Sequence, residues 1–326
     1  MISKGNTGVV MLLPGGDGVI KAPVPWYSNY LKRFQREQLR REIAVYRHLP
    51  QGHRRLIRML GYNEGSAVDD SKGRKGTSEH GQRKDGNDKA GNGHVEDDVS
   101  VTLEYMPNHS LRSYLMGGAK FPAPDDEQRA RGAAIPRRRR ACWALEATDG
   151  IVLLHAHDVI HADIRPDNML LDDGLHVRLI DFSGCSLRGT PALSYESASF
   201  YMPRTPENSN GKVGCSVTTD LFALGSSYYQ IVTCFAPWHG LSHDEVEARY
   251  NRGEFPPLVE DDPPPDGESK STSGSMLFAD TIWRCWHGEF ATAADVLNSL
   301  KAEIRAAFSP EDLAFIEQES GISLSE

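Results

Sequence analysis

Two aspartates and an asparagine stand at fixed spacing in the middle of the chain. The stretch HADIRPDN, residues 161–168, places Asp163 five residues before Asn168, and Asp181 follows thirteen residues later at the start of DFSG. In-line phosphoryl transfer needs one carboxylate that orients or accepts the proton of the attacking hydroxyl. It also needs a second carboxylate and an amide that hold Mg²⁺ on the phosphates. The order and spacing of these side chains predict a phosphotransferase site.

A short glycine-containing stretch near the N-terminus could contact the phosphates of a nucleotide. SKGNTGVV, residues 3–10, has Gly5 and Gly8 three apart in a strand–turn–strand setting, and Val10 follows. Glycines allow backbone N–H groups to approach phosphates closely, and a valine shortly after them can cover an adenine ring. Taken alone, this pattern fits a plain hairpin turn better than a phosphate-binding loop. It indicates nucleotide binding only in combination with the other motifs.

Lys21 and Glu42 form a candidate ion pair. Lys21 ends the apolar run VIK, where one ammonium can turn inward to a phosphate, although a lysine at a strand end more often faces solvent. Glu42 stands in the middle of an expected helix, and alone it would be interpreted as an exposed acidic residue. Together they fit the lysine–glutamate pair that directs an ammonium toward phosphates.

The elements that must position these side chains follow from hydrophobic periodicity. Residues 9–13 and 18–21 are expected to form a β-hairpin, and an expected helix at 31–49 has Leu39, Ile43 and Tyr46 on one face. The early part is rich in strands and the later part is mostly helical, which predicts an α+β chain in two lobes. Further strands are expected at 100–105 and 177–180, and helices at 137–157, 221–234 and 291–307, with a short helix after Ser309.

Three stretches are predicted to be solvated insertions without a fixed fold. Residues 63–99 contain no Leu, Ile, Met or aromatic residue, so they cannot offset the entropy lost on ordering. Residues 116–136 and 256–275 are shorter, with proline clusters. The dense basic run at 137–140 fits the solvated start of a helix better than a targeting or docking patch.

Composition limits the classes of protein that fit. The 326 residues can bury a substantial core, and 39% hydrophobic with 25% charged residues is ordinary for a soluble protein. A net charge of −9 argues against general nucleic-acid affinity. No apolar run is long enough to span a bilayer, and the five cysteines have no metal-ligand spacing. An intracellular protein, cytoplasmic or nuclear, with structural thiols is expected.

The motifs together resemble the eukaryotic protein kinase domain over residues 2–304, most closely filamentous-fungal Ser/Thr protein kinases. The resemblance implies a bilobal kinase domain at 1–305. Its small N-lobe would be 1–103 and would contain the insertion at 63–99. The hinge would be 104–106, the larger C-lobe 107–305, and a C-terminal tail with a short helix would occupy 306–326. The narrower match lies in EIAVYRHLP, HADIRPDNMLLDD, LIDFSGCSL, FYMPR, TDLFALGSS and CWHGEFATAADVL.

The resemblance also implies how ATP would be bound. Lys21 would pair with Glu42 and contact the α- and β-phosphates. Leu103 would be the gatekeeper of the adenine pocket, and the hinge from Glu104 to Met106 would read the adenine edge. The remaining implied ATP contacts are Ser3, Gly5, Gly8 and Val10.

Roles in phosphoryl transfer follow from the same resemblance. Asp163 would be the catalytic base, and Asn168 and Asp181 would bind Mg²⁺, with Mn²⁺ as an alternative ion. Arg165 would take the place of the lysine that steadies the γ-phosphate in Ser/Thr kinases. Asp220 would brace the catalytic loop from below.

Three substitutions depart from the family pattern. Ser3 replaces the first glycine of the nucleotide loop and bears on ATP affinity more than on ATP binding. Ala162 replaces the arginine that often pairs with a phosphorylated activation-loop residue, so activity independent of such phosphorylation is expected. Ser183 replaces the first glycine after Phe182 and should restrict flips of the Asp181 segment.

The end of the activation segment departs as well. It reads YMPRTPE at 201–207, so either Arg204 or Glu207 can occupy the position of the usual glutamate. In the family that glutamate pairs with an arginine near the last helices, where this chain has Glu289. One hypothesis is a charge-swapped pair of Arg204 with Glu289, and the alternative is that Glu207 keeps the role with another partner.

Three functions remain open on the sequence. The first is an active Ser/Thr protein kinase, a monomer that uses MgATP and a protein substrate, with no nucleic acid and no membrane as partner. The second is a pseudokinase scaffold that binds nucleotide without efficient transfer. The third is a small-molecule phosphotransferase of the aminoglycoside or choline kinase type, which Arg165-Pro166 and the DFSG turn disfavour.

Overall fold

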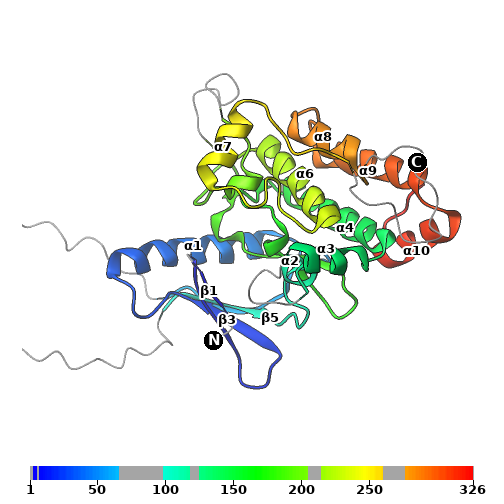
Figure 1. Ribbon diagram of the computed structural model, residues 1–326. Coiled ribbons are helices and arrows are strands. Elements are labelled where there is room, and N and C mark those ends of the chain that lie inside the picture. The colour runs from blue at the N-terminus through cyan, green and yellow to red at the C-terminus, as the bar shows by residue number, and fades with distance from the viewer. Residues whose placement is uncertain are drawn as a thin grey trace, which may run out of the picture.

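The computed structural model has two lobes that differ in secondary structure (Figure 1). The structure describes residues 3–5, 7–65, 98–117, 125–204, 214–259 and 276–325. A sheet with the helix α1 lying across it forms one lobe, and a group of helices forms the other. Within the described ranges, none of the helices combines the length and apolar character that crossing a bilayer requires.

The N-lobe is a five-stranded antiparallel sheet in the order β1-β2-β3-β5-β4. Its centre is the predicted hairpin, which is confirmed, and Lys21 in β3 pairs in register with Val10 on one side and Val101 on the other. Valines suit these positions because branched side chains pack well on a pleated sheet. The strands are β1 (Ser3–Gly5), β2 (Gly8–Leu12), β3 (Gly18–Ala22), β4 (Met59–Asn63) and β5 (Ser100–Glu104).

Helix α1 (Asn29–His48) is the only α-helix among the described residues before β5. Ser28 caps it, because the Ser28 hydroxyl accepts a hydrogen bond from Leu31 N. The predicted apolar face is confirmed, since Leu39, Ile43 and Tyr46 are all buried. Glu42 is fully buried on the same helix, so α1 brings one carboxylate under the sheet.

The C-lobe is built around two helices that are buried on most sides. In α4 (Arg137–Ala156) the residues Trp143, Leu145 and Ile151 are fully buried, and in α6 (Val217–Thr233) so are Phe222 and Tyr228. The expected helices at 137–157, 221–234 and 291–307 are confirmed within a few residues. The remaining helices are α2 (Leu111–Leu115), α3 (Asp125–Ala133), α7 (His243–Asn251), α8 (Ala279–Trp286), α9 (Ala293–Ala307) and α10 (Pro310–Ser320).

Two small antiparallel sheets of two strands each carry the C-lobe residues of the site. One pairs β7 (Met169–Leu171) with β8 (Val177–Leu179), and the other pairs β6 (Val159–Ile160) with β9 (Ser186–Leu187). The polar ends of these strands carry the motifs singled out in the sequence. β7 begins directly after Asn168, and β8 ends two residues before Asp181.

The predicted insertions need correction at their edges. Asn63 belongs to β4, Val99 is buried, and Asp98 forms a bidentate pair with Arg36 of α1 at 2.7 and 2.9 Å. Within 116–136, residues 125–133 form the helix α3. Good helix formers such as Ala, Glu, Gln and Arg occupy that stretch, and the buried Gln128 donates to the Cys234 carbonyl. Residues 66–97, 118–124 and 260–275 of these predictions lie outside the described residues.

The basic run at 137–140 begins α4 as expected, but it is only partly solvated, because Arg140 is buried and its neighbours form ion pairs. Arg138 pairs with Asp312 at 3.1 Å and Arg139 with Glu319 at 2.8 Å, both on α10. Arg140 is buried and donates to backbone carbonyls at the end of α6, among them that of Val232 at 2.9 Å. These cations therefore hold α10 and α6 against α4.

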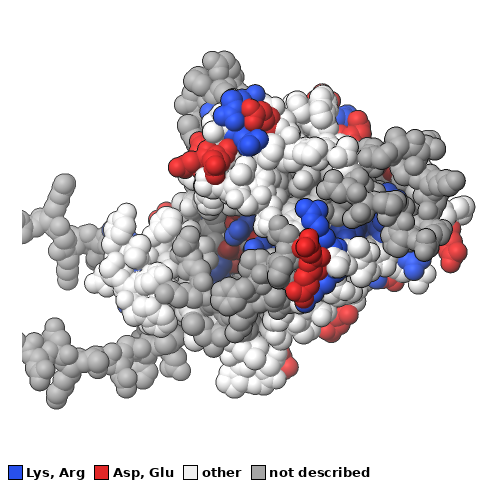
Figure 2. All heavy atoms as spheres, in the orientation of Figure 1, with Lys and Arg blue, Asp and Glu red and all other residues white. Residues whose placement is uncertain are grey.

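Charges of both signs are interspersed on the face shown in Figure 2, with blue and red atoms side by side and some of them recessed between the lobes. All five cysteines are free thiols, and four of them are buried. Burial raises the pKa of the Cys142 thiol to about 12. Four of the five thiols are thus packed inside the protein.

Candidate active site

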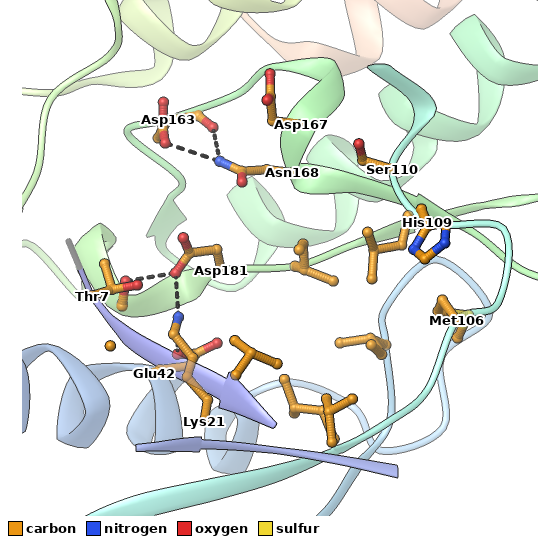
Figure 3. Close-up of a pocket in the computed structure, with 18 of the residues that line it drawn as sticks. Thr7, Lys21, Glu42, Met106, His109, Ser110, Asp163, Asp167, Asn168 and Asp181 are labelled. Carbon is orange, nitrogen blue, oxygen red and sulfur yellow. Dashed lines mark hydrogen bonds and ion pairs between the residues drawn. The ribbon is translucent and has the colours of Figure 1, made fainter. Parts of the chain in front are cut away.

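A cleft of about 570 Å³ lies between the two lobes and collects the side chains predicted to do chemistry. Val10, Val19, Leu103 and Leu170 are among its apolar lining. Figure 3 shows Met106 and His109 at one end of the cleft and Asp163, Asn168 and Asp181 at the other, opposite Lys21 and Glu42. An apolar slot with a cluster of charges at one end suits a ligand with a flat ring and an anionic tail.

Lys21 is the centre of a buried charge cluster. Its Nζ lies 2.8 Å from Glu42 Oε2 and 2.7 Å from Asp181 Oδ1. Burial alone would lower the pKa of Lys21, but the carboxylates of Asp181 and Glu42 outweigh burial and raise it. Burial likewise opposes the charge of Asp181, and the Lys21 ammonium overcomes it and lowers the Asp181 pKa to about 2. Lys21 and Asp181 are therefore charged at neutral pH, whereas burial, only partly opposed by Lys21, raises the pKa of Glu42.

The catalytic-loop residues contact one another on the C-lobe side of the cleft. Asn168 Nδ2 donates to the Asp163 carbonyl at 2.8 Å and to Asp163 Oδ2 at 3.0 Å. Arg165 Nε lies 3.2 Å from Asp163 Oδ1 as an ion pair. Burial, only partly opposed by Arg165, raises the pKa of Asp163 above its ordinary value. A carboxylate with a raised pKa is a better proton acceptor than an exposed aspartate.

Asp220 lies beneath this loop and holds its backbone. Asp220 Oδ2 accepts from His161 N at 2.8 Å, and Oδ1 accepts from Ala162 N at 2.9 Å. The Asp220 side chain is fully buried, and His155 Nε2 lies 3.0 Å from Oδ2. Ala162 has φ 66, a left-handed conformation that costs a non-glycine residue free energy. The two backbone hydrogen bonds that Asp220 accepts offset that cost and fix the turn that precedes Asp163.

The residues around Asp181 fix the direction of its carboxylate. Ser183 Oγ donates to Asp181 Oδ1 at 2.6 Å, so this serine does more than restrict the backbone. Phe182 is fully buried and packs edge-on against Tyr46 of α1, with ring centroids 5.0 Å apart, and against His161 at 5.6 Å. The Asp181 turn is thus anchored to both lobes.

The donor set fits Mg²⁺, a hard cation that prefers oxygen ligands. Asp181 Oδ1 accepts hydrogen bonds from Lys21 and Ser183, which leaves the other carboxylate oxygen, Oδ2, as a metal ligand. Asn168 donates through its amide nitrogen, which leaves its amide oxygen as a second ligand. Among the described residues, no three His, Cys, Asp or Glu side chains gather as a metal cluster. Mg²⁺ at nucleotide sites is usually bound through one or two carboxylates and the phosphates instead.

The predicted nucleotide loop lies on the N-lobe side of the cleft. Thr7, Gly8 and Val10 line the cleft, and the backbones of Ser3 and Gly5 lie in β1, which pairs with β2, while the Ser3 side chain lies outside the described atoms. Gly8 has φ 147, and a Cβ there would stand 2.4 Å from the Ala22 carbonyl oxygen. Glycine is required at this position because β2 passes so close to β3.

The predicted gatekeeper and hinge lie along the apolar end of the cleft. Leu103 is buried and lines the cleft with Glu104 and Met106. The Glu104 carboxylate accepts a hydrogen bond from Arg58 N at 2.8 Å and so holds the predicted hinge against the residue that precedes β4. The sequence did not single out His109, Ser110, Ser113 and Asp167, which also line the cleft. The only sequence signal for these cleft residues is their position: His109, Ser110 and Ser113 follow the predicted hinge, and Asp167 lies within the predicted catalytic loop.

The hypothesis of a charge-swapped pair between Arg204 and Glu289 is wrong. Arg204 Nη2 donates to both carboxylate oxygens of Glu196, at 3.0 and 2.8 Å, and both side chains are almost fully buried. Glu289 is instead 3.5 Å from Arg284 on the surface. The family pattern suggested a distant partner, whereas the nearest carboxylate lies eight residues earlier in the same segment. Glu207, the alternative, lies outside the described residues.

Comparison with known proteins places this site in a family. The family model described as "Protein kinase domain" matches residues 21–295, well over half of the chain. The chain therefore belongs to the protein kinase domain family. The α+β, two-lobed kinase fold predicted from the sequence is confirmed.

The similar individual proteins are Ser/Thr protein kinases by name or Aurora kinases, at low identity. The chain is 25% identical to the proto-oncogene serine/threonine-protein kinase mos of Rattus norvegicus over 148 residues, 43% of this chain and 41% of that protein. It is 24% identical to Aurora kinase A-A of Xenopus laevis over 270 residues, 80% of this chain and 53% of that protein. It is 23% identical to Aurora kinase C of Mus musculus over 256 residues, 78% of this chain and 75% of that protein. The chain thus spans about half or less of the length of the first two relatives.

Proposed function

We propose that this protein is an ATP-dependent protein kinase that transfers the γ-phosphate of MgATP to Ser and Thr hydroxyls of protein substrates. The observation that carries the proposal is the buried cluster of Lys21, Glu42 and Asp181 facing Asp163 and Asn168 across one cleft. All five positions required for phosphoryl transfer hold competent residues in one site. The preference for Ser and Thr is supported by Arg165-Pro166 and by the name of the mos relative.

In this proposal the chain's own residues position the reactants. Lys21, directed by Glu42, binds the α- and β-phosphates, and the apolar slot up to Met106 holds the adenine. Asn168 and Asp181 would hold Mg²⁺, which when bound would supply charge that neutralises the phosphates. Asp163 orients the substrate hydroxyl and accepts its proton, and its raised pKa favours that transfer.

Arg165 completes the reacting side of the cleft. Its Nε lies 3.2 Å from Asp163 Oδ1, so the guanidinium stands beside the base and is available to the transferring phosphoryl group. Stabilisation of developing charge by preplaced cations is a large contribution to phosphoryl transfer. The position of Arg165 supports the role that a lysine has in related Ser/Thr kinases.

We also propose that activity does not depend on phosphorylation of the activation segment. Ala162 offers no guanidinium to a phosphate. The segment is instead held by Arg41 of α1, which donates to the carbonyls of Cys185 at 2.5 Å and Pro191 at 3.0 Å. Farther along, the buried pair of Glu196 and Arg204 ties the segment to itself. These contacts form without any added phosphate.

A kinase assay tests both parts. Wild type and Asp163→Asn are incubated with MgATP and generic Ser, Thr and Tyr peptides, with and without prior phosphatase treatment. We expect phosphate on Ser and Thr peptides, loss of transfer in Asp163→Asn, and full activity after phosphatase. A wild type that binds nucleotide without transfer would support the scaffold alternative. If phosphatase treatment abolished activity and phosphorylation of a single residue in the activation segment restored it, the proposed independence from that phosphorylation would be refuted.

A further inference from the structure

The buried Arg55 joins the C-terminal segment to the helix beneath the active site. Arg55 lies in the turn between α1 and β4, and only 2% of its side chain is exposed. Its Nε donates to Asp149 Oδ2 at 2.9 Å, and Nη1 lies 3.2 Å from Glu146 Oε1, both on α4. Its Nη2 donates to the carbonyl of Ser320, the last residue of α10. A buried guanidinium needs several partners, and one of them here lies beyond residues 21–295 that the family shares.

The same residues hold the strand that leads to Asp181. Leu179 N donates to the Arg55 carbonyl at 2.8 Å, at the end of β8. Glu146, which pairs with the Arg55 guanidinium, also accepts from Val177 N at 2.8 Å, at the start of β8. Both ends of β8 are therefore bonded to Arg55 or to its partner. Asp181 follows only two residues after β8 ends.

Helix α10 is docked on α4 independently of Arg55 (Figure 1). Ile316 of α10 is fully buried, and Leu324, after the helix, is 3% exposed. Leu324 N donates to Glu317 Oε1 at 2.7 Å, and Arg305 of α9 donates to the Leu324 carbonyl at 2.6 Å. Packing on α4 and α9 thus fixes where the Ser320 carbonyl lies, and through it the guanidinium of Arg55.

We propose that α10 and the residues after it act through Arg55 as a positioning element for the metal ligand Asp181. The inference rests on the proposed function, because it concerns the Mg²⁺ site of that reaction. With α10 docked, the Arg55 backbone holds β8 in the register that places Asp181 beside Lys21. With α10 undocked, the guanidinium lacks a buried partner, β8 loosens, and Mg²⁺-dependent nucleotide binding weakens while Mg²⁺-independent binding is kept.

Two substitutions in the full chain break this link from opposite ends. Ile316→Asp puts a carboxylate into the interface of α10 with α4. Arg55→Lys keeps the positive charge but removes the planar guanidinium, whose three nitrogens reach three acceptors. ADP affinity is measured by calorimetry with and without Mg²⁺. We expect the ratio of the two affinities to fall roughly tenfold in both variants, as for other groups that orient metal ligands. Amide hydrogen exchange at 177–181 should quicken.

Arg54→Gln is the matched control. Arg54 donates to the Gly321 carbonyl at 2.9 Å, but its side chain is 51% exposed. This variant should keep the wild-type Mg²⁺ ratio and the wild-type exchange rates. Wild-type values in folded Ile316→Asp and Arg55→Lys would overturn the inference, and if Ile316→Asp does not fold, Arg55→Lys decides it. If the ADP affinity of the wild type were the same with and without Mg²⁺, the proposed function would be refuted instead. The amide hydrogen exchange rates at 177–181 would still test whether α10 acts on β8 through Arg55.

Discussion

Breaking the buried pair of Glu196 and Arg204 should destabilise the protein and slow phosphoryl transfer. Glu196→Gln leaves the Arg204 guanidinium, 4% exposed, without a counter-charge. Removing one partner of a buried ion pair costs about 3–5 kcal/mol. We expect the lower end, about 3 kcal/mol, because the glutamine oxygen still accepts one hydrogen bond and the Tyr201 ring lies 4.5 Å from the guanidinium carbon.

Urea unfolding measures the loss of stability, and a kinase assay with saturating MgATP measures kcat. Arg204→Gln in the Glu196→Gln background removes the orphaned charge, so the double variant should recover part of the lost stability. Glu289→Gln is the control, because its pair with Arg284 is exposed and worth at most about 1 kcal/mol. An unfolding free energy of Glu196→Gln equal to that of Glu289→Gln would refute the assignment of the pair.

Three further predictions follow from the site. The kcat should fall as pH falls through the pKa of Asp163, because the base must be ionised; since burial raises that pKa above 3.8, an acid limb centred at or below pH 3.8 would contradict this. Asp220→Asn should lower the unfolding free energy by about 2–3 kcal/mol in urea titrations, because its buried carboxylate accepts from two backbone N–H groups, and wild-type stability would argue against the brace. Gly8→Ala should destabilise the protein by about 1–3 kcal/mol more than Gly15→Ala, because both have positive φ but only Gly8 would place a Cβ 2.4 Å from the Ala22 carbonyl; equal thermal shifts would refute the contact.

The parts of the fold that could be predicted from the sequence are those where local pattern and chemistry agree. The apolar face of α1 was readable because Leu39 and Ile43 recur with the helical period. The order and spacing of Asp163, Asn168 and Asp181 pointed to one site, because phosphoryl transfer requires these groups in a fixed relation. Their convergence on one cleft with Lys21 depends on strand register, which only the three-dimensional structure supplies.

The features that could not be predicted depend on partners distant in sequence or on competition between partners. The basic run 137–140 looked solvated because its acidic partners, Asp312 and Glu319, stand on a helix far along the chain. One of the two hypotheses from the family pattern paired Arg204 with Glu289, but Arg204 pairs with a nearer carboxylate, that of Glu196. Helix α3 was missed because few apolar residues mark it.

The central claim is that this cleft transfers phosphate from MgATP with Asp163 as the base. The most direct test is a single-turnover measurement of γ-phosphate transfer from ATP, in wild type beside Asp163→Asn, with MgATP binding determined on the same samples. We predict that both proteins bind MgATP comparably and that transfer in Asp163→Asn is slower by at least about 100-fold. Equal transfer rates in the two proteins, or no transfer in a wild type that binds MgATP, would contradict the claim.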